Sequence, residues 1–326
     1  MALIERPVAR DQGLAGRQPG DQAPGRAAAN GSIGGHPTTA DVAAVVVNFN
    51  AGTSLAACVR SLQAEGVGAI VVVDNDSHDG SAESVAPEVR VLPTGANLGY
   101  GTAANVGVSM VSQPYVLVMN PDVEVAPGTV AALVAALEHD PLLGAVGPRV
   151  ETPDGALYPS ARRFPDLVVA AGHAFFGFVA PENRFSRAYK LLDWDHTTAG
   201  DVDWVSGSCM LVRRSAFDAV GGFDEHYFMY AEDVDLCWRL GRAGWRVGYD
   251  PAGRVVHTGA VSTDQAPYRM ILEHHRSLWR FACSSTMGAR RLALPAVAAG
   301  LGARTVLAWT QRAAEGARAR RQAPRG

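Results

Sequence analysis

The chain has 326 residues, of which 48% are hydrophobic, and it carries a formal net charge of −3. This size and apolar content suffice for one large or two small globular domains with a buried core, and the nearly neutral charge gives no sign of a nucleic-acid-binding protein. The four cysteines are widely spaced without a CxxC pair, which predicts buried, reduced thiols in a cytosolic protein rather than disulfides or a zinc site.

Residues 1–40 are rich in glycine, alanine, proline and arginine and show no hydrophobic periodicity. This composition predicts a disordered tail, and the segment lacks the apolar core of a signal peptide. We expect the folded domain to begin at Asp41 and to extend to residue 285.

From Asp41 onward, strand-like apolar runs alternate with helical segments. The predicted strands are 42–49, 69–73, 89–92, 115–119 and 144–150, and the predicted helices are 53–64, 102–110 and 127–139. Such alternation is typical of a parallel α/β sheet, whose ligands bind beyond the carboxyl ends of the strands. Three of these strand ends carry polar residues, namely Asn48 and Asn50, Asp74 and Asn75, and Asn120 and Asp122.

The region 151–203 is less regular, with four prolines and an aromatic cluster at Phe175, Phe176 and Phe178. We expect it to be a long excursion that covers an acceptor site. The predicted elements that follow are a strand at 204–213, a short helix at 215–220, strands at 246–249 and 254–257, and a helix at 264–281.

The stretch 223–239 (FDEHYFMYAEDVDLCWR) interleaves five carboxylates with Tyr227, Phe228, Met229 and Tyr230. A pocket with aromatic walls around a few ionised groups accommodates both kinds of side chain. The helical pattern begins at Glu232, so Glu232 and Asp233 are predicted in a first turn, where the helix macrodipole favours the charged carboxylate that a general base needs. Ordinary capping is the alternative for these two acids. Asp235 is expected on another face as a structural residue.

Two further residues suggest a divalent cation. Asp122 follows a strand in a proline-fixed turn, and Mg²⁺ or Mn²⁺ bound to a nucleotide commonly takes one or two carboxylates together with phosphate oxygens. His257 ends the last predicted strand and could be a second ligand, since imidazole binds Mn²⁺ well. A simple Asn-Pro-Asp turn and a structural histidine remain the alternatives. Asp74, at the floor of the expected crevice, could accept the imide N–H of a pyrimidine base.

The segment 286–326 is a distinct C-terminal extension. Its run from Leu292 to Trp309 is largely apolar but contains Arg304, with further arginines before and after it. That pattern favours an interfacial anchor on anionic lipid over a spanning helix. A helix packed on the domain with a loose basic tail is the alternative.

Six segments occur in a fixed order along the chain: VVVNFN (45–50), VVVDNDSHDGS (71–81), NLGYGTAANVGV (97–108), VMNPDV (118–123), VSGSCMLVRRSAFDAVGGFDEHYFMYAEDVDLCWRLGRAGW (205–245) and VVHTGAVS (255–262). Together they resemble the family 2 inverting glycosyltransferases, and within these the rhamnosyltransferase branch. The resemblance covers residues 42–281. It implies the GT-A fold, which is Rossmann-like with a mostly parallel central sheet flanked by helices, here followed by a C-terminal helical extension.

The resemblance also implies roles for individual residues. Asp233 would be the catalytic base, with Glu232 as its neighbour on the acceptor side. Asp122 and His257 would bind Mg²⁺ or Mn²⁺. The nucleotide sugar would be bordered by Asn48, Asn50, Asp74, Asn97, Gly99, Asn120 and Asp122. Tyr230, Arg269 and Arg276 are candidate contacts for the acceptor or a diphosphate.

The implied reaction transfers one L-rhamnose from dTDP-L-rhamnose to a lipid-linked N-acetylglucosaminyl diphosphate in cell-wall linker synthesis. The enzyme would act in the cytoplasm, peripherally on the inner face of the cell membrane. Asn120 departs from the family's DXD motif and removes one charge from the metal site. The QxxRW motif of processive members is absent, which favours addition of a single sugar.

Two other functions remain open on the sequence. A sugar-nucleotide-forming nucleotidyltransferase also uses an α/β sheet and a metal, but the loop 48–52 lacks the basic residues such enzymes carry after the first strand. A catalytically silent nucleotide-sugar-binding protein would keep Asp74 and Asp122 without requiring Asp233.

Overall fold

The computed structural model describes residues 37–164, 182–259 and 267–322. Its strands are β1 (Val42–Asn48), β2 (Ala69–Asp74), β3 (Arg90–Pro93), β4 (Tyr115–Met119), β5 (Val123–Val125), β6 (Leu143–Glu151), β7 (Leu157–Tyr158), β8 (Ala161–Arg162), β9 (Gly200–Val202), β10 (Trp204–Val205), β11 (Cys209–Arg213) and β12 (Arg246–His257). Its helices are η1 (Thr39–Asp41), α1 (Ser54–Glu65), η2 (Ala82–Ser84), α2 (Tyr100–Ser109), α3 (Thr129–His139), α5 (Arg184–Lys190), α6 (Arg214–Ala219), α7 (Glu232–Arg242), α8 (Pro267–Ser285), η4 (Gly288–Ala293) and α9 (Leu294–Gln322).

The central sheet is mixed but mostly parallel, as predicted. Its order is β3-β2-β1-β4-β11-β6-β12-β5. Strands β3, β2, β1 and β4 are mutually parallel, and so are β6 and β12, whereas β11 lies antiparallel between β4 and β6. Every residue of β1 is buried, which explains why this strand is apolar throughout rather than alternating.

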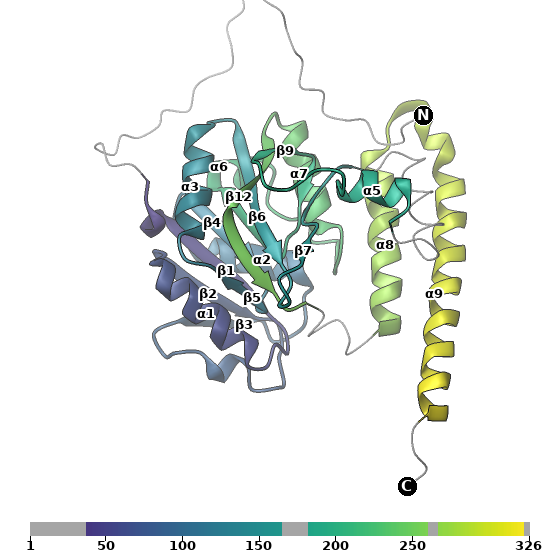
Figure 1. The fold of residues 1–326 in the computed structure, drawn as a ribbon, viewed down its shortest axis with the longest axis horizontal. Helices are drawn as coiled ribbons and strands as arrows, with labels where there is room; N and C mark the ends of the chain where they lie inside the picture. The colour runs from purple at the N-terminus through teal and green to yellow at the C-terminus, as the bar shows by residue number, and fades with distance from the viewer. Residues whose placement is uncertain (1–36, 165–181, 260–266, 323–326) are drawn as a thin grey trace, which may run out of the picture.

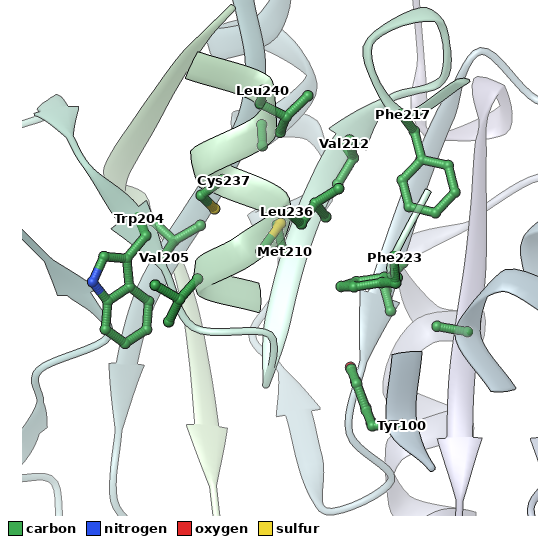
Figure 2. Packing of buried hydrophobic residues seen from close by; sticks show 14 of the residues in the cluster. Tyr100, Trp204, Val205, Met210, Val212, Phe217, Phe223, Leu236, Cys237 and Leu240 are labelled. Atoms are coloured by element: carbon green, nitrogen blue, oxygen red, sulfur yellow. The ribbon is translucent and has the colours of Figure 1, made fainter. Parts of the chain in front are cut away.

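Helices cover both faces of the sheet and bury two apolar clusters (Figure 1). On one face, α1 and α3 contribute Leu55, Leu62, Leu133 and Leu137. On the other face lie α2, α6 and α7, and Figure 2 shows Leu236 and Cys237 of α7 close to Met210 and Val212 of β11. The α7 helix, which begins at Glu232, is therefore fixed to the sheet by its apolar side.

Several predicted boundaries were wrong. The expected strand 204–213 is two strands, because β10 pairs with β8 in a separate sheet while β11 stays in the central one. The two short strands around Asp250 are the single strand β12, which has an irregularity between Asp250 and Arg254. Strand β5 was not predicted, and the first turn η1 lies partly within the expected tail. The aromatic cluster at 175–178 lies outside the described residues.

The C-terminal helices α8 and α9 form an antiparallel pair beside the α/β domain (Figure 1). Helix α8 is joined to the domain by Phe281, which belongs to the same buried cluster as Trp238. Helix α9 leaves large apolar side chains in solvent, and Leu292, at the end of η4, is 86% exposed. Among the described residues, Gly288–Thr310 is the one helical stretch that is long and apolar enough to cross a membrane.

Candidate active site

The ends of β1 and β2 form a buried polar network. The parallel register places Asn48 beside Asp74. Asn48 Nδ2 donates to Asp74 Oδ1 at 2.8 Å, and it lies 3.0 Å from the Ser77 hydroxyl and 2.9 Å from the Ser81 hydroxyl. The Ser77 backbone N–H lies 3.3 Å from the second oxygen of Asp74. This network holds the Asp74 carboxylate at the strand end, where the sequence predicted a group that reads a nucleotide base.

Asn50 lies in the neighbouring loop in a left-handed conformation, with φ of 49°. Its Oδ1 accepts a hydrogen bond from the backbone of His78 at 2.8 Å. The contact joins the loop after β1 to the loop after β2, so Asn50 shapes the rim of the same strand-end crevice.

Asn75, which follows β2, holds a neighbouring loop in place. Its side chain is buried, its Nδ2 donates to Asn97 Oδ1 at 3.0 Å, and its Oδ1 accepts from the Leu98 backbone at 2.9 Å. Asn75 therefore fixes the loop that carries Asn97 and Gly99. The asparagine directly after the buried strand was the available signal.

Gly99 connects the donor side of the site to the 223–239 stretch. Its φ is +86°, and a Cβ at this position would lie 2.2 Å from the carbonyl oxygen of Phe228. The next residue, Tyr100, donates its backbone N–H to that same carbonyl at 3.0 Å. Glycine is therefore required both by the left-handed backbone and by the close approach.

Asp122 and His257 meet at the far end of the same sheet edge. Strand β5 pairs antiparallel with β12 and sets Val123 opposite His257, which brings the preceding Asp122 alongside. Asp122 Oδ1 lies 3.2 Å from His257 Nε2, and Asn120 Nδ2 lies 3.4 Å from the same nitrogen. The pairing of β5, a strand that was not predicted, with β12 thus brings together the two residues that were predicted as metal ligands.

The two side chains Asp122 and His257 would fill only part of the coordination sphere of a metal ion and leave the remaining positions to water or substrate. Across the part of the chain that the structure describes, no three His, Cys, Asp or Glu side chains cluster. One carboxylate and one imidazole suit Mg²⁺ or Mn²⁺, which usually retain waters and bind substrate phosphates.

Asp233 is held by two backbone hydrogen bonds. Its Oδ2 accepts from Gly207 at 2.8 Å, and its Oδ1 accepts from Val234 at 2.8 Å. Gly207 lies between β10 and β11, and its carbonyl accepts the Tyr100 hydroxyl at 2.6 Å. In the same turn, the Ser208 carbonyl accepts the backbone N–H of Asn120. The turn Ser206–Ser208 therefore links the base candidate to the metal pair, and the glycine inside a predicted strand was its only sequence signal.

Burial, rather than the helix dipole, dominates the charge state of the two acids. Burial and the neighbouring Asp233 raise the pKa of Glu232 to about 8. Burial also raises the pKa of Asp233, although the hydrogen bonds from Gly207 and Val234 oppose the shift. Burial therefore opposes the ionisation that the helix dipole favours, because removal from water disfavours the charged form of a carboxyl group. A raised pKa makes Asp233 a stronger base once it is ionised.

Glu232 is buried, and its Oε2 has no hydrogen-bond partner among the described residues. Burying an unpaired carboxyl oxygen costs stability, so its retention here fits a role on bound substrate. The acceptor-side role implied for Glu232 by the family resemblance stays a prediction.

The other residues of the 223–239 stretch have different settings in the fold. Asp235 forms an ion pair with Arg239 at 2.6 Å and is structural, as predicted. Tyr227 was expected in a pocket wall but is 1% exposed, packs in the core and donates its hydroxyl to Asp235. Tyr230 has φ of 67°, and its ring lies 5.1 Å from that of His274 on α8.

The two arginines proposed as diphosphate contacts lie on α8. The Arg269 guanidinium lies 4.6 Å from the centre of the Phe228 ring. Arg276 pairs with Glu273 at 2.9 Å, and its side chain is 63% exposed. Arg269 therefore lies against the 223–239 stretch, whereas Arg276 is a solvated surface residue.

This geometry can now be set beside known proteins. The sequence model of Glycosyl transferase family 2 matches residues 43–221, more than half of the chain, and that of Glycosyl transferase family group 2 matches residues 164–309. The chain belongs to glycosyl transferase family 2. The resemblance in the sequence motifs is thereby confirmed, and the nucleotidyltransferase alternative is excluded.

Individual relatives narrow the comparison. Over 260 residues the chain is 42% identical to the N-acetylglucosaminyl-diphospho-decaprenol L-rhamnosyltransferase of Mycobacterium tuberculosis, covering 75% of this chain and 84% of the relative. It is 23% identical to the low-salt glycan biosynthesis hexosyltransferase Agl10 of Haloferax volcanii, over 76% of each chain.

The fold also matches a solved glycosyltransferase. The structure of the mannosyltransferase PcManGT from Pyrobaculum calidifontis, in complex with GDP-Man and Mn²⁺, superposes with a TM-score of 0.52 at 18% identity, covering 86% of this chain and 80% of that one. The GT-A-like mixed α/β architecture predicted from the sequence is confirmed.

Proposed function

We propose that this glycosyltransferase transfers one L-rhamnosyl residue from dTDP-L-rhamnose to N-acetylglucosaminyl-diphospho-polyprenol, with inversion at the anomeric carbon, in cell-wall linker synthesis. The observation that carries the proposal is the 42% identity, over 75% of the chain, to a relative that bears this activity in its name. The donor nucleotide is supported by the motif resemblance to the rhamnosyltransferase branch.

Asp233 is the general base of this reaction. Its carboxylate is fixed by the Gly207 and Val234 N–H groups and takes the proton of the acceptor hydroxyl as that oxygen attacks the anomeric carbon. The bond from the anomeric carbon to the phosphate oxygen breaks, and its electron pair leaves with dTDP. Direct displacement inverts the configuration without a covalent sugar–enzyme intermediate.

The donor lies along the carboxyl ends of β1, β2 and β4. Asp74, held by Asn48, accepts from the base, and the Asn75-anchored loop with Asn97 and Gly99 borders the sugar. Asp122 and His257 would hold Mg²⁺ or Mn²⁺, which supplies positive charge to the donor diphosphate and to the leaving group.

The C-terminal helices bring the enzyme to its lipid-linked acceptor, at the cytoplasmic face of the membrane, where it binds peripherally. Leu292 and Val306 are 86% and 63% exposed. Arg290 and Arg291 belong to the short helix η4, which carries Leu292 and directly precedes α9, whereas Val306 lies within α9. Exposed apolar side chains together with arginines suit the interface of an anionic bilayer. Arg304 within the apolar run favours this arrangement over a spanning one.

The catalytic proposal is tested with purified enzyme, radiolabelled dTDP-L-rhamnose and a farnesyl-diphosphate-linked N-acetylglucosamine. The expected result is metal-dependent transfer of one rhamnose and no further extension, with other nucleotide sugars used at least tenfold less well. Donor binding without transfer would instead support the silent nucleotide-sugar-binding alternative.

The membrane proposal is tested by flotation with anionic and neutral vesicles. Val306→Glu should reduce binding to anionic vesicles several-fold, because it places a carboxylate on the apolar face. Leu142→Glu is the matched control, since Leu142 is 58% exposed on the α/β domain. Equal binding of the two variants would contradict an anchor in α9.

A further inference from the structure

Arg162 lies in a cage of three aromatic rings. Its guanidinium carbon is 4.9 Å from the ring centre of Trp204, 5.6 Å from that of Tyr189 and 5.7 Å from that of Tyr158. Its Nε donates to the Pro159 carbonyl at 2.8 Å, and its Nη2 donates to the Tyr158 hydroxyl at 3.2 Å. The charged group is therefore held in one orientation.

Arg162 forms no direct ion pair in the described part of the protein, although the charge of Asp233 contributes to raising the pKa of its guanidinium. Other partly buried arginines of this chain pair with acids, as Arg149 does with Glu151 and Arg239 with Asp235. Within residues 37–164, 182–259 and 267–322, no carboxylate forms an ion pair with Arg162. A partly buried cation without a counter-charge is costly unless a ligand supplies one.

A second cation follows one of the rings of this cage in the sequence. Lys190 is the only lysine in the sequence and directly follows Tyr189, whose ring contacts Arg162. It is half-buried, and it too has no ion pair with a carboxylate of the described residues. Burial lowers the pKa of Lys190, and the charge of Arg162 lowers it further. The two cations therefore repel each other in the free protein and together form a site suited to an anion.

Arg162 lies between the proposed catalytic base and helix α8. Strand β8 sets Arg162 opposite Trp204 of β10, and β10 leads directly into the turn that holds Asp233. Two residues after Arg162, beyond the end of β8, the Phe164 ring lies 6.2 Å from that of Phe281 on α8. A ligand bound here faces Asp233 on one side and the helices proposed to meet the membrane on the other.

We propose that Arg162 and Lys190 bind the diphosphate of the lipid-linked acceptor. This inference rests on the proposed function, in which the reaction brings two diphosphates together. The donor diphosphate has its counter-charge at Asp122 and His257, so the acceptor diphosphate requires another. In the acceptor, the diphosphate is one sugar ring away from the hydroxyl that must reach Asp233. Arginine binds phosphate oxygens in bidentate fashion, and lysine adds a point charge.

The test compares Arg162→Gln and Lys190→Gln with Arg163→Gln, a matched control on the exposed neighbouring arginine. The assay uses two acceptors, farnesyl-diphospho-N-acetylglucosamine and an alkyl N-acetylglucosaminide without phosphate. Each active-site variant should raise KM for the diphosphate acceptor about tenfold to a hundredfold, the loss expected for one charge-assisted hydrogen bond. KM for dTDP-L-rhamnose should stay near wild type in both variants, and all constants with the alkyl acceptor should stay near wild type in Lys190→Gln, whereas Arg162→Gln also removes a charge that lowers the pKa of Asp233. Arg163→Gln should change none of these constants.

Two results would overturn the inference. One is an equal loss with both acceptors, which indicates that the pair only shapes the site. The other is a rise in KM for dTDP-L-rhamnose with the acceptor KM unchanged, which assigns the cations to the donor. Arg162→Lys keeps a charge if Arg162→Gln disturbs folding, and it should retain part of the affinity for the diphosphate acceptor.

The inference can fail separately from the proposed function. If the wild-type enzyme transfers no rhamnose, the proposed function fails, and the cation pair is then tested by calorimetry with farnesyl diphosphate and farnesol. Tighter binding of the diphosphate that is lost in Lys190→Gln supports the site, and equal binding of both probes excludes it.

Discussion

Replacing Asp233 with asparagine tests the assignment of the base most directly. The substitution preserves the shape of the side chain but removes its ability to take a proton. In the structure both oxygens accept a backbone N–H, from Gly207 and from Val234, each at 2.8 Å. Asparagine can satisfy only one of them, because its amide nitrogen is a donor.

The effects of Asp233→Asn on stability and on catalysis should differ in size. One unsatisfied N–H costs about 1–3 kcal/mol of stability, and relief of a buried charge opposes this loss. The net change should move Tm by only a few degrees. Loss of general-base catalysis should lower kcat by about 10²–10⁴, which is about 2.7–5.4 kcal/mol of transition-state stabilisation. The activity loss therefore exceeds any effect of partial unfolding.

The assay measures kcat for rhamnosyl transfer, Kd for dTDP by calorimetry and Tm for each protein. Asp235→Asn is the matched control, because Asp235 is a buried carboxylate on the same helix whose partner is Arg239. It should lower Tm while leaving kcat per folded molecule within about threefold of wild type. Turnover of Asp233→Asn within threefold of wild type, or an equal loss in Asp235→Asn, would refute the assignment.

Three further predictions concern the charge state, the backbone and the metal. The pKa of Glu232 rises from 4.5 to about 8 on folding. The stability that Glu232 contributes is therefore full below pH 4.5 and is lost as the pH rises through 8. Glu232→Gln should flatten this part of the pH–stability profile measured by urea unfolding. Gly99→Ala should destabilise the fold by at least about 2 kcal/mol more than Gly128→Ala. Both glycines have positive φ, but only at Gly99 would the new Cβ strike the Phe228 carbonyl. Comparable losses of stability in chemical denaturation would contradict the role of that contact. Asp122→Ala should weaken metal-dependent binding of dTDP-L-rhamnose at least tenfold and bring it to the level of wild type in EDTA, and unchanged metal dependence would remove Asp122 from the metal site.

The sequence alone established the parallel strands and the polar residues at their ends. The run 42–49 is apolar without alternation, which requires burial on both faces, and its neighbours 69–73 and 115–119 share this property. Asn48, Asp74 and Asp122 then follow at a common edge, because the carboxyl ends of parallel strands lie together. The helix start at Glu232 was equally visible in the spacing of Leu236 and Leu240.

Other features required contacts between residues far apart in the chain. Strand β5 is three residues long and has no signal of its own, yet its pairing with β12 brings Asp122 next to His257. The turn Ser206–Ser208 looked like the interior of a strand, because whether Trp204 and Cys209 belong to one sheet or two is decided by their partners.

The pKa values of the two acids and the surroundings of Arg162 and Lys190 also depend on the tertiary structure. The spacing of Glu232 and Asp233 predicts a helix terminus, but desolvation depends on what packs around them, and here it raises both pKa values and so opposes the effect of the dipole. Likewise, Arg162 and Lys190 are 28 positions apart in an irregular region, and nothing local distinguishes them from surface cations. Their common setting arises because β8 pairs with β10 and α5 places Tyr189 against the guanidinium. Local sequence patterns determined where polar groups occur in this protein, and long-range packing determined which of them are buried together.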